Sequence, residues 1–238
     1  ASAKGAKPIR LAAIRAVPEI GQPIAAPAMV ELLADSDREI AQAAQESLAA
    51  LPGKEVDAIV MAMLSNNEPV RRMAALDLVA RRRMMGSMPA LLKASTDSDA
   101  KVRALALRKV GELGGPQDIP ALLDLLMKTR TGQEVDAAEQ ALSAICAKGG
   151  DAESAVGAVA ARMAQATPEQ KGALLRVLSS LGGARALESV RAAVGDTDGE
   201  VRAAAIRTLG EWKTADAAPD LLTLAKSTTN PTERALCL

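Results

Sequence analysis

The sequence of 238 residues contains no histidine, phenylalanine or tyrosine, and only one tryptophan. Histidine is the side chain that most often transfers protons near neutral pH, so its absence argues against acid–base catalysis. Aliphatic residues and methionine supply nearly all of the 49% of residues that are hydrophobic. Alanine and leucine favour helices, whereas the aromatic residues that favour strands are almost missing. The composition therefore predicts an all-α protein with a large core.

Three further features are also missing from the sequence. The 29 basic and 29 acidic residues cancel, whereas a protein that binds the phosphate backbone usually carries a basic excess. Cys146 and Cys237 are too few for a disulfide framework and lack zinc-site spacing. No run approaches the roughly 18 to 20 apolar residues of a membrane span. We therefore expect no metal, no cofactor and no membrane insertion, and a function other than catalysis.

One segment of the sequence recurs about a hundred residues later. DSDAKVRALALRKVGELGG begins at Asp97, and DTDGEVRAAAIRTLGEW begins at Asp196. When Arg103 and Arg202 are aligned, equivalent positions recur in steps of about 30 to 36 residues, which is typical of a repeat array. These equivalent positions are Arg10, Ala41, Arg71, Val135, Lys171 and Arg234.

Each repeat after the first begins with the pattern of a capped helix. Four residues before the aligned position stands a residue that favours helix N-caps: Asp37, Asn67, Asp99, Thr131, Thr167, Asp198 or Asn230. Glu134 and Gln170 complete two capping boxes with their threonines. Three residues after the aligned position a mostly small residue recurs: Ala13, Ala44, Ala74, Ala106, Ala138, Leu174, Ala205 and Cys237. A branched residue follows at the seventh position, so both lie on one helical face.

Glycine ends most of these helices, and a second, shorter apolar helix follows, such as residues 119–129. Such a pair of antiparallel helices cannot bury its own apolar face and must stack on its neighbours. We predict repeats at 6–36, 37–66, 67–98, 99–130, 131–166, 167–197 and 198–229 within a single domain 1–238. The fifth repeat is longer, so we expect a longer connection or an extended helix there.

Residues 230–238 match only the opening of an eighth repeat. A helix this short is unstable alone. We therefore expect the segment to be poorly ordered or to pack against another molecule, and the chain to be a fragment of a larger protein.

The loop Asp-x-Asp, the Val-Arg that follows, the Ala-rich helix and the later Pro-x-Leu-Leu helix together resemble short HEAT-like repeats. The resemblance extends over the whole chain, although the second and fifth repeats lack the arginine (Ala41 and Val135). It implies a right-handed α-solenoid of about seven helical hairpins. It also implies a structural ladder between loop aspartates and arginines, here Asp97 with Arg103 and Asp196 with Arg202.

Solenoids of this class bind partners along extended concave surfaces. We expect the second helix of each pair to line that surface and to bind a protein or peptide, because its outward charges alternate in sign. The outward positions, from helical spacing, are Glu31, Asp57, Lys93, Asp124, Lys128, Arg162, Glu188, Arg191, Asp220 and Lys226.

Two other functions remain open. The arginines between Arg71 and Arg83 are a candidate nucleic-acid site, and HEAT-like alkylpurine DNA glycosylases bind duplex DNA along such a solenoid. Phycocyanobilin lyases also carry short HEAT-like repeats, which keeps a bilin-lyase-like enzyme as an alternative.

The remaining unusual residues have a structural interpretation. Trp212, Cys146 and Cys237 fall at or beside positions that are apolar in other repeats, so we expect them to pack in the core. Six of the nine methionines lie between Met61 and Met88. Methionine suits adaptable binding surfaces and also fills gaps in cores, and we expect the second use here.

Overall fold

The computed structural model describes the backbone of residues 3–237 and the side chains of residues 7–237. All regular structure in this part of the chain is helical, as predicted. The chain divides into two compact units, Ala1–Leu113 and Gly114–Leu238.

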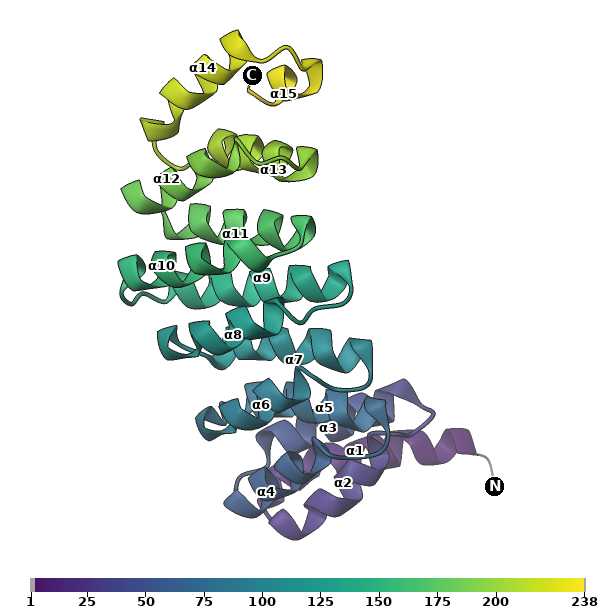
Figure 1. The fold of residues 1–238 in the computed structure, drawn as a ribbon. Coiled ribbons are helices and arrows are strands. Elements are labelled where there is room, and N and C mark those ends of the chain that lie inside the picture. The colour runs from purple at the N-terminus through teal and green to yellow at the C-terminus, as the bar shows by residue number, and fades with distance from the viewer. Residues whose placement is uncertain (1–2, 238) are drawn as a thin grey trace. The chain divides into compact units, whose positions relative to one another are not determined.

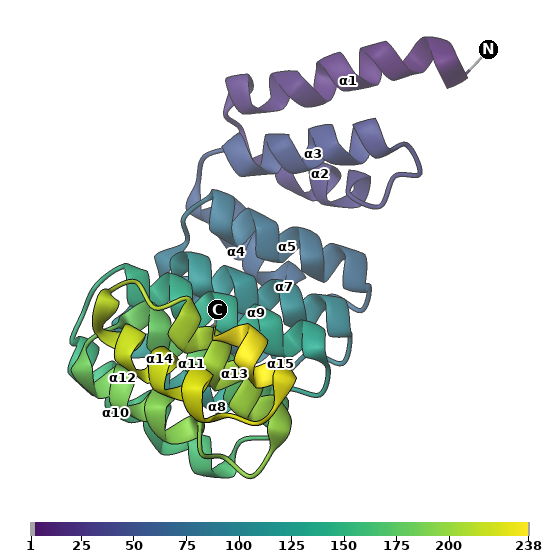
Figure 2. The ribbon, with the colours of Figure 1, turned by 90° about the horizontal axis from the view of Figure 1, so that it is seen from above.

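Unit 1 contains four long first helices and three shorter second helices (Figure 1). The first helices are α1 (Ala3–Ile20), α3 (Arg38–Ala50), α5 (Pro69–Arg81) and α7 (Ala100–Leu113). The second helices are α2 (Ala26–Leu32), α4 (Lys54–Met63) and α6 (Met88–Ala94). The first helices pack side by side in one layer, and each second helix packs against the first helix of the next repeat (Figure 2).

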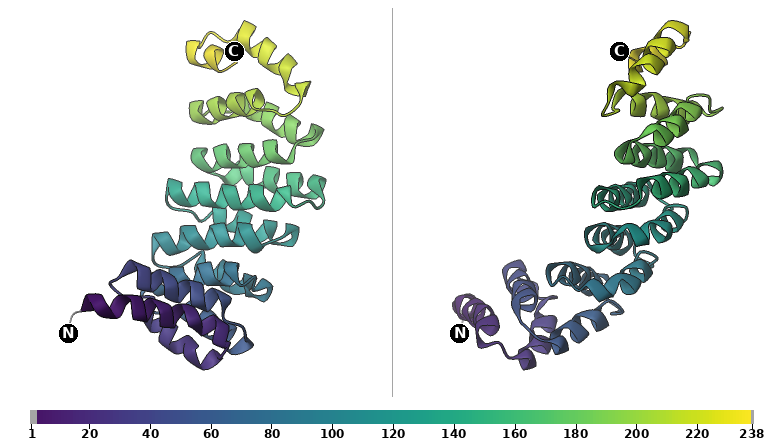
Figure 3. Two further views of the ribbon diagram at one scale, coloured as in Figure 1. Left: turned by 180° about the vertical axis from the view of Figure 1, so that it is seen from behind. Right: turned by 90° about the vertical axis from the view of Figure 1, so that its left-hand side faces the viewer.

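Unit 2 repeats this arrangement (Figure 3). Its first helices are α9 (Gly132–Ala147), α11 (Pro168–Leu181), α13 (Gly199–Gly210) and the short α15 (Pro231–Leu236). Its second helices are α8 (Ile119–Leu126), α10 (Ala152–Arg162), α12 (Ala184–Ala193) and α14 (Ala218–Ser227). Each unit is therefore a stack of helical hairpins, the architecture of an α-solenoid.

Most of the expected helix starts are confirmed. Asp37, Thr131, Thr167, Asp198 and Asn230 are N-caps whose side chains accept N–H bonds from the first helical turn. The capping box of Thr167 and Gln170 is complete.

Two details of the expected caps are wrong. Glu134 accepts a bond from the Arg130 N–H rather than completing a box with Thr131. The N-cap of α5 is Glu68 and not Asn67, because Pro69 occupies the first helical position. The third repeat is therefore shifted by one residue.

The predicted core positions are largely buried. Ala106 and Val110 are fully buried in α7, as are Ala138 and Leu142 in α9. In α1, however, Ala13 is exposed, because this helix packs on α3 through Leu11 and Ile14. Trp212, Cys146 and Cys237 are only half-buried, since each lies at the end of its helix, so they are not the core residues we expected.

The fifth repeat has the predicted extension. α9 has 16 residues and α10 has 11, whereas α7 has 14 and α8 has 8. The helices still stack, since α9 packs against α11. Gly149 and Gly150 in the connecting turn both have positive φ, so the turn falls where the sequence places its glycines.

The short C-terminal segment differs from the expectation of disorder. Asn230 caps α15, and the helix packs against α13 and α14. The Glu233 carboxylate accepts bonds from Thr228 Oγ1 and Arg202 Nε, which hold the segment in place. α14 contains no fully buried residue, as expected for a second helix that is only partly covered.

Candidate partner-binding surfaces

Six of the ten side chains predicted for the partner surface form ion pairs. Arg162 bonds Asp124 at 2.6 Å, which joins α10 to α8, and Arg191 bonds Asp220 at 2.8 Å, which joins α12 to α14. These pairs link neighbouring second helices of unit 2. Exposed pairs of this kind contribute only about 0.2–1 kcal/mol each, so they act mainly as alignment contacts.

The two acidic positions in unit 1 are also paired. Glu31 accepts two bonds from Arg71 at 3.2 and 3.1 Å, and this contact and the guanidinium charge lower the pKa of Glu31. Asp57 accepts a bond from Arg82 Nε at 2.7 Å. All six paired positions are therefore committed to contacts within the repeat stack.

The other four predicted positions are Lys93, Lys128, Glu188 and Lys226. All four side chains are exposed, and none of these side chains makes a hydrogen bond or ion pair within the part of the chain that the structure describes. Their charges are free to contact a partner. Lys93 belongs to unit 1, and the other three belong to unit 2.

The expected ladder exists, but its partners differ from those that the resemblance implied. The Asp97 carboxylate bonds Arg72 at 2.7 Å rather than Arg103, and the Asp196 carboxylate bonds Lys171 at 2.7 Å rather than Arg202. Arg10 bonds Asp35 in the same way at 2.6 Å. In all three pairs the aspartate lies 25 residues after the cation, so each cation reaches the loop that leads into the next repeat.

The ladder aspartates also order their own loops. Each accepts an N–H bond from the residue two positions later, which is Asp37, Asp99 or Asp198. Burial raises the pKa of Asp97, but the Arg72 guanidinium and the Asp99 N–H bring it below its ordinary value of 3.8. Lys171 is the main cause of the lowered pKa of Asp196.

Arg103 and Arg202 contact the expected aspartates, Asp97 and Asp196, through the main-chain oxygens. Arg103 Nη1 donates to the main-chain oxygens of Asp97 and Ser98 at 2.7 and 3.0 Å. Arg202 Nη1 makes the same two contacts, with the oxygens of Asp196 and Thr197. Both guanidinium groups therefore cap the loop that precedes their own helix.

Much of the arginine cluster between Arg71 and Arg83 is used inside the fold. Arg72 is 9% exposed and bonds the Asn66 and Asn67 oxygens as well as Asp97. Arg82 bonds the oxygens of Leu48 and Leu51 at the end of α3. Arg71 is held by Glu31 and Glu68. Arg81 and Arg83 remain exposed and without a bonded side chain in the described chain.

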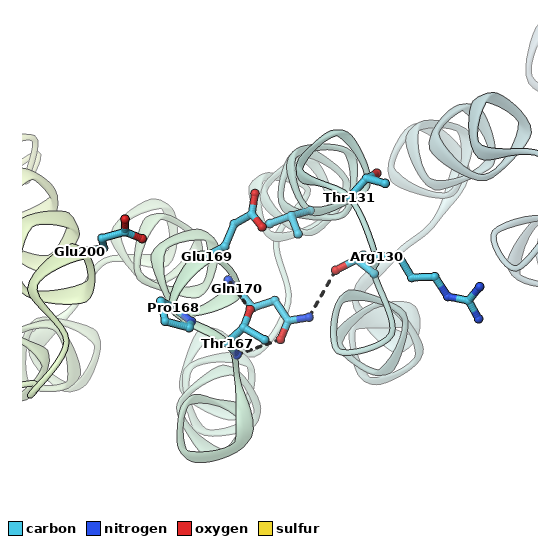
Figure 4. A pocket seen from close by; sticks show the side chains of 9 residues that line it. Arg130, Thr131, Thr167, Pro168, Glu169, Gln170 and Glu200 are labelled. Carbon is cyan, nitrogen blue, oxygen red and sulfur yellow. Dashed lines mark hydrogen bonds between the residues drawn. The ribbon is translucent and has the colours of Figure 1, made fainter.

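A pocket of about 370 Å³ lies where α9 and α11 begin (Figure 4). The buried Gln170 side chain forms part of its wall and donates to the Leu126 oxygen at 3.0 Å and to Thr129 Oγ1 at 3.3 Å. Glu169, Glu200 and Arg130 are exposed around the opening. These bonds join Gln170 to the end of α8, and Gln170 Oε1 also accepts the Thr167 N–H at 3.0 Å, which caps α11. Helix capping and this contact between helices therefore account for the structure of the pocket.

The two cysteines do not have the surroundings of a nucleophile. Burial raises the pKa of both thiols, which lowers the fraction of thiolate at neutral pH.

Within residues 7–237, no group of three or more acidic or cysteine side chains is arranged to hold a metal ion. Every helix among the described residues is too short or too polar to span a lipid bilayer.

The stacked hairpins, capped loops and ladder contacts define a helical repeat protein. The sequence profile of HEAT repeats matches residues 2–80, 56–143 and 157–238, and the chain belongs to the HEAT-repeat family. No curated protein matches the chain.

Solved structures with similar folds are distant in sequence. The complex of CpcE and CpcF of phycocyanin lyase from Nostoc sp. PCC7120 is 19% identical, with a TM-score of 0.48 over 75% of this chain and 73% of that chain. An engineered protein is 20% identical, with a TM-score of 0.45 over 79% and 96% of the two chains. Human deoxyhypusine hydroxylase is 18% identical, with a TM-score of 0.40 over 94% and 86%. Likeness at this level does not transfer the activity of these proteins to this chain.

Proposed function

We propose that this HEAT-repeat chain is a non-enzymatic scaffold that binds a protein partner through the exposed charges of its second helices. The proposal rests on the observation that some of the ten candidate side chains are already paired within the protein and others are not. Lys93, Lys128, Glu188 and Lys226 are exposed and unpaired in the described chain, whereas the other six are bonded within the stack.

A charge without an intramolecular partner can pair with another molecule without first breaking an existing contact. The four free side chains carry both signs, which suits the mixed charges of a protein surface better than a polyanion. The contacts of the arginines between Arg71 and Arg83 also favour a protein partner over a polyanion. Arg71, Arg72 and Arg82 already contact carboxylates, so within this cluster only Arg81 and Arg83 have exposed side chains free to neutralise phosphates.

The proposal is tested by reversing the four free charges in a K93E/K128E/E188K/K226E variant. A matched control, R15E/R108E/R207E/E211K, makes the same net change at exposed positions, three within first helices and one at the C-cap of α13. Wild type and both variants are immobilised, and proteins captured from an extract of the source organism are measured by quantitative mass spectrometry.

We expect at least one captured protein to fall about tenfold with the first variant and to be retained by the control, since reversing exposed charges slows the association of a complex steered by complementary charge. Capture that is equal with the two variants would contradict the proposal. Capture that disappears after nuclease treatment would favour the nucleic-acid alternative instead.

A further inference from the structure

An open groove of about 430 Å³ lies between α3 and α5, within unit 1. Its apolar lining includes Ala41 from α3 and Val70, Met73 and Ala74 from α5. Val70 lies three residues before Met73 and four before Ala74, so the three α5 residues share one helical face. The groove is on the first helices and is distinct from the second-helix charges described above.

The apolar lining of this groove is accessible to solvent. Val70 is 56% exposed, although it is a large hydrophobic residue. Met73 is half-buried, although methionine was expected to fill the core. Met73 is a flexible and polarizable side chain that adapts to the shape of a bound apolar group.

Two arginines stand beside this apolar strip. Arg38 at the start of α3 and Arg81 at the end of α5 are exposed, and neither guanidinium group makes a hydrogen bond or ion pair within the described residues. The only acidic side chain in the lining is Asp77, which is already paired with Lys109 at 3.0 Å. The groove therefore combines an apolar strip with two uncommitted positive charges.

We infer that this groove binds a short segment of a protein partner in which apolar side chains are flanked by carboxylates. The inference rests on the proposed function, because it assumes that the chain binds protein. Charge complementarity selects the acidic segment, since Arg38 and Arg81 lack carboxylate partners of their own. The lining from Val70 to Arg81 extends for roughly 16 Å along α5, which fits a segment of about three helical turns.

A nucleic acid fits this groove less well than an acidic peptide. Single-stranded nucleic acids bind by stacking their bases on aromatic side chains, and the lining contains none. A second copy of the chain is the alternative occupant of the groove, and the experiments below distinguish it from a segment of a partner protein.

The test is selection of 12-residue peptides from a random display library against the wild-type chain. The selected peptides are then synthesised with a fluorescent label, and their Kd values are measured by anisotropy. We expect the selected peptides to be enriched in Asp and Glu together with Leu, Ile, Met or Phe. Failure to select any peptide, or selection of basic peptides, would overturn the inference.

Three variants locate the binding site of these peptides. R38E/R81E reverses the groove charges and should raise Kd about tenfold, whereas R15E/R108E makes the same charge change at exposed, unpaired arginines outside the groove and should raise it less than about twofold. A74F fills the apolar strip without a change of charge and should also weaken binding by about tenfold. Circular dichroism checks that each variant is folded. Equal affinity for R38E/R81E and the R15E/R108E control would overturn the inference.

The second-helix variant separates this inference from the proposed function. If K93E/K128E/E188K/K226E loses the peptides and R38E/R81E retains them, the proposed function stands and the groove is not the site. Analytical ultracentrifugation addresses the second copy. A wild-type dimer that R38E/R81E separates into monomers would assign the groove to self-association and overturn the inference of a partner segment.

Discussion

Arg72 Nη2 lies 2.7 Å from Asp97 Oδ1, and the two side chains come from successive repeats. Both side chains are nearly buried, at 10% and 13% exposure. The same contact recurs between Arg10 and Asp35 and, with a lysine, between Lys171 and Asp196. In the third repeat Arg72 also bonds the oxygens of its own loop, so a single guanidinium ties two loops together.

Removing this contact should destabilise the fold. Arg72→Ala leaves the Asp97 carboxylate poorly solvated without its cation, and we expect a loss of about 3 kcal/mol in the free energy of unfolding. Arg15→Ala removes an exposed, unpaired arginine from α1 and should change the value by less than about 0.5 kcal/mol. Urea unfolding followed by circular dichroism measures both. Equal effects of the two substitutions would show that the ladder contact is unimportant.

The ladder also predicts a pH dependence. The pKa values of Asp35, Asp97 and Asp196 all lie below the ordinary value of 3.8. The carboxylates of the folded protein therefore hold their protons less tightly than those of the unfolded chain, so their contribution is fully present well above pH 3.8. It is lost as the pH falls through the lower, folded pKa values.

The urea midpoint of the wild type should consequently fall between about pH 5 and pH 3, because the unfolded chain takes up the protons first. A D35N/D97N/D196N variant should be less stable at pH 7 and should show a shallower decline over this range. A decline as steep as that of the wild type would mean that other carboxylates cause the pH dependence.

Substitution of Arg83 should raise the free energy of unfolding, in contrast to the substitutions above, which lower it. Arg83 has a φ of 50° where α5 ends, a conformation that glycine adopts without steric strain. Arg83→Gly should therefore stabilise the protein by about 0.5–1 kcal/mol, as judged by the urea midpoint. Arg15→Gly, inside α1, is the matched control and should cost about 1 kcal/mol. A loss of stability with Arg83→Gly would show that the arginine makes a contact that outweighs its strain.

Arg82 supports a prediction about the end of a helix. Its Nη1 donates to the Leu48 oxygen at 2.7 Å and to the Leu51 oxygen, while Nε bonds Asp57. Lysine keeps the charge but cannot present donors in this planar arrangement. Arg82→Lys should therefore cost about 1–3 kcal/mol by urea unfolding. The exposed neighbour substitution Arg81→Lys should have almost no effect, and a similar loss there would contradict the capping role.

Much of the fold could be predicted because capping residues and glycines mark the ends of the helices in most repeats. Thr167, Gln170 and Gly182 mark the start and end of α11 in the sequence, and the structure agrees. The third repeat was misaligned because two asparagines and two arginines stand side by side there. Pro69 was the informative signal, since proline favours the first helical position and places the cap at Glu68.

The residues that pair in the ladder contacts could not be predicted from the sequence of a single repeat. Arg72 and Asp97 are separated by 25 residues, and neither residue alone indicates which neighbour it reaches. The same limit applied to the candidate surface. Helical spacing predicts an outward position on a second helix for both Arg162 and Lys128. Only the three-dimensional structure shows that Arg162 is paired with Asp124.

The central claim, protein binding by the free second-helix charges, is tested most directly by lysine footprinting. The chain is acetylated with and without a protein partner that it captures, and mass spectrometry reports the modification of each lysine. We predict that the partner protects Lys93, Lys128 or Lys226, while Lys54, Lys101 and Lys213, whose side chains are also exposed and unpaired in the described chain, remain modified. Unchanged modification of Lys93, Lys128 and Lys226 in the complex would contradict the claim.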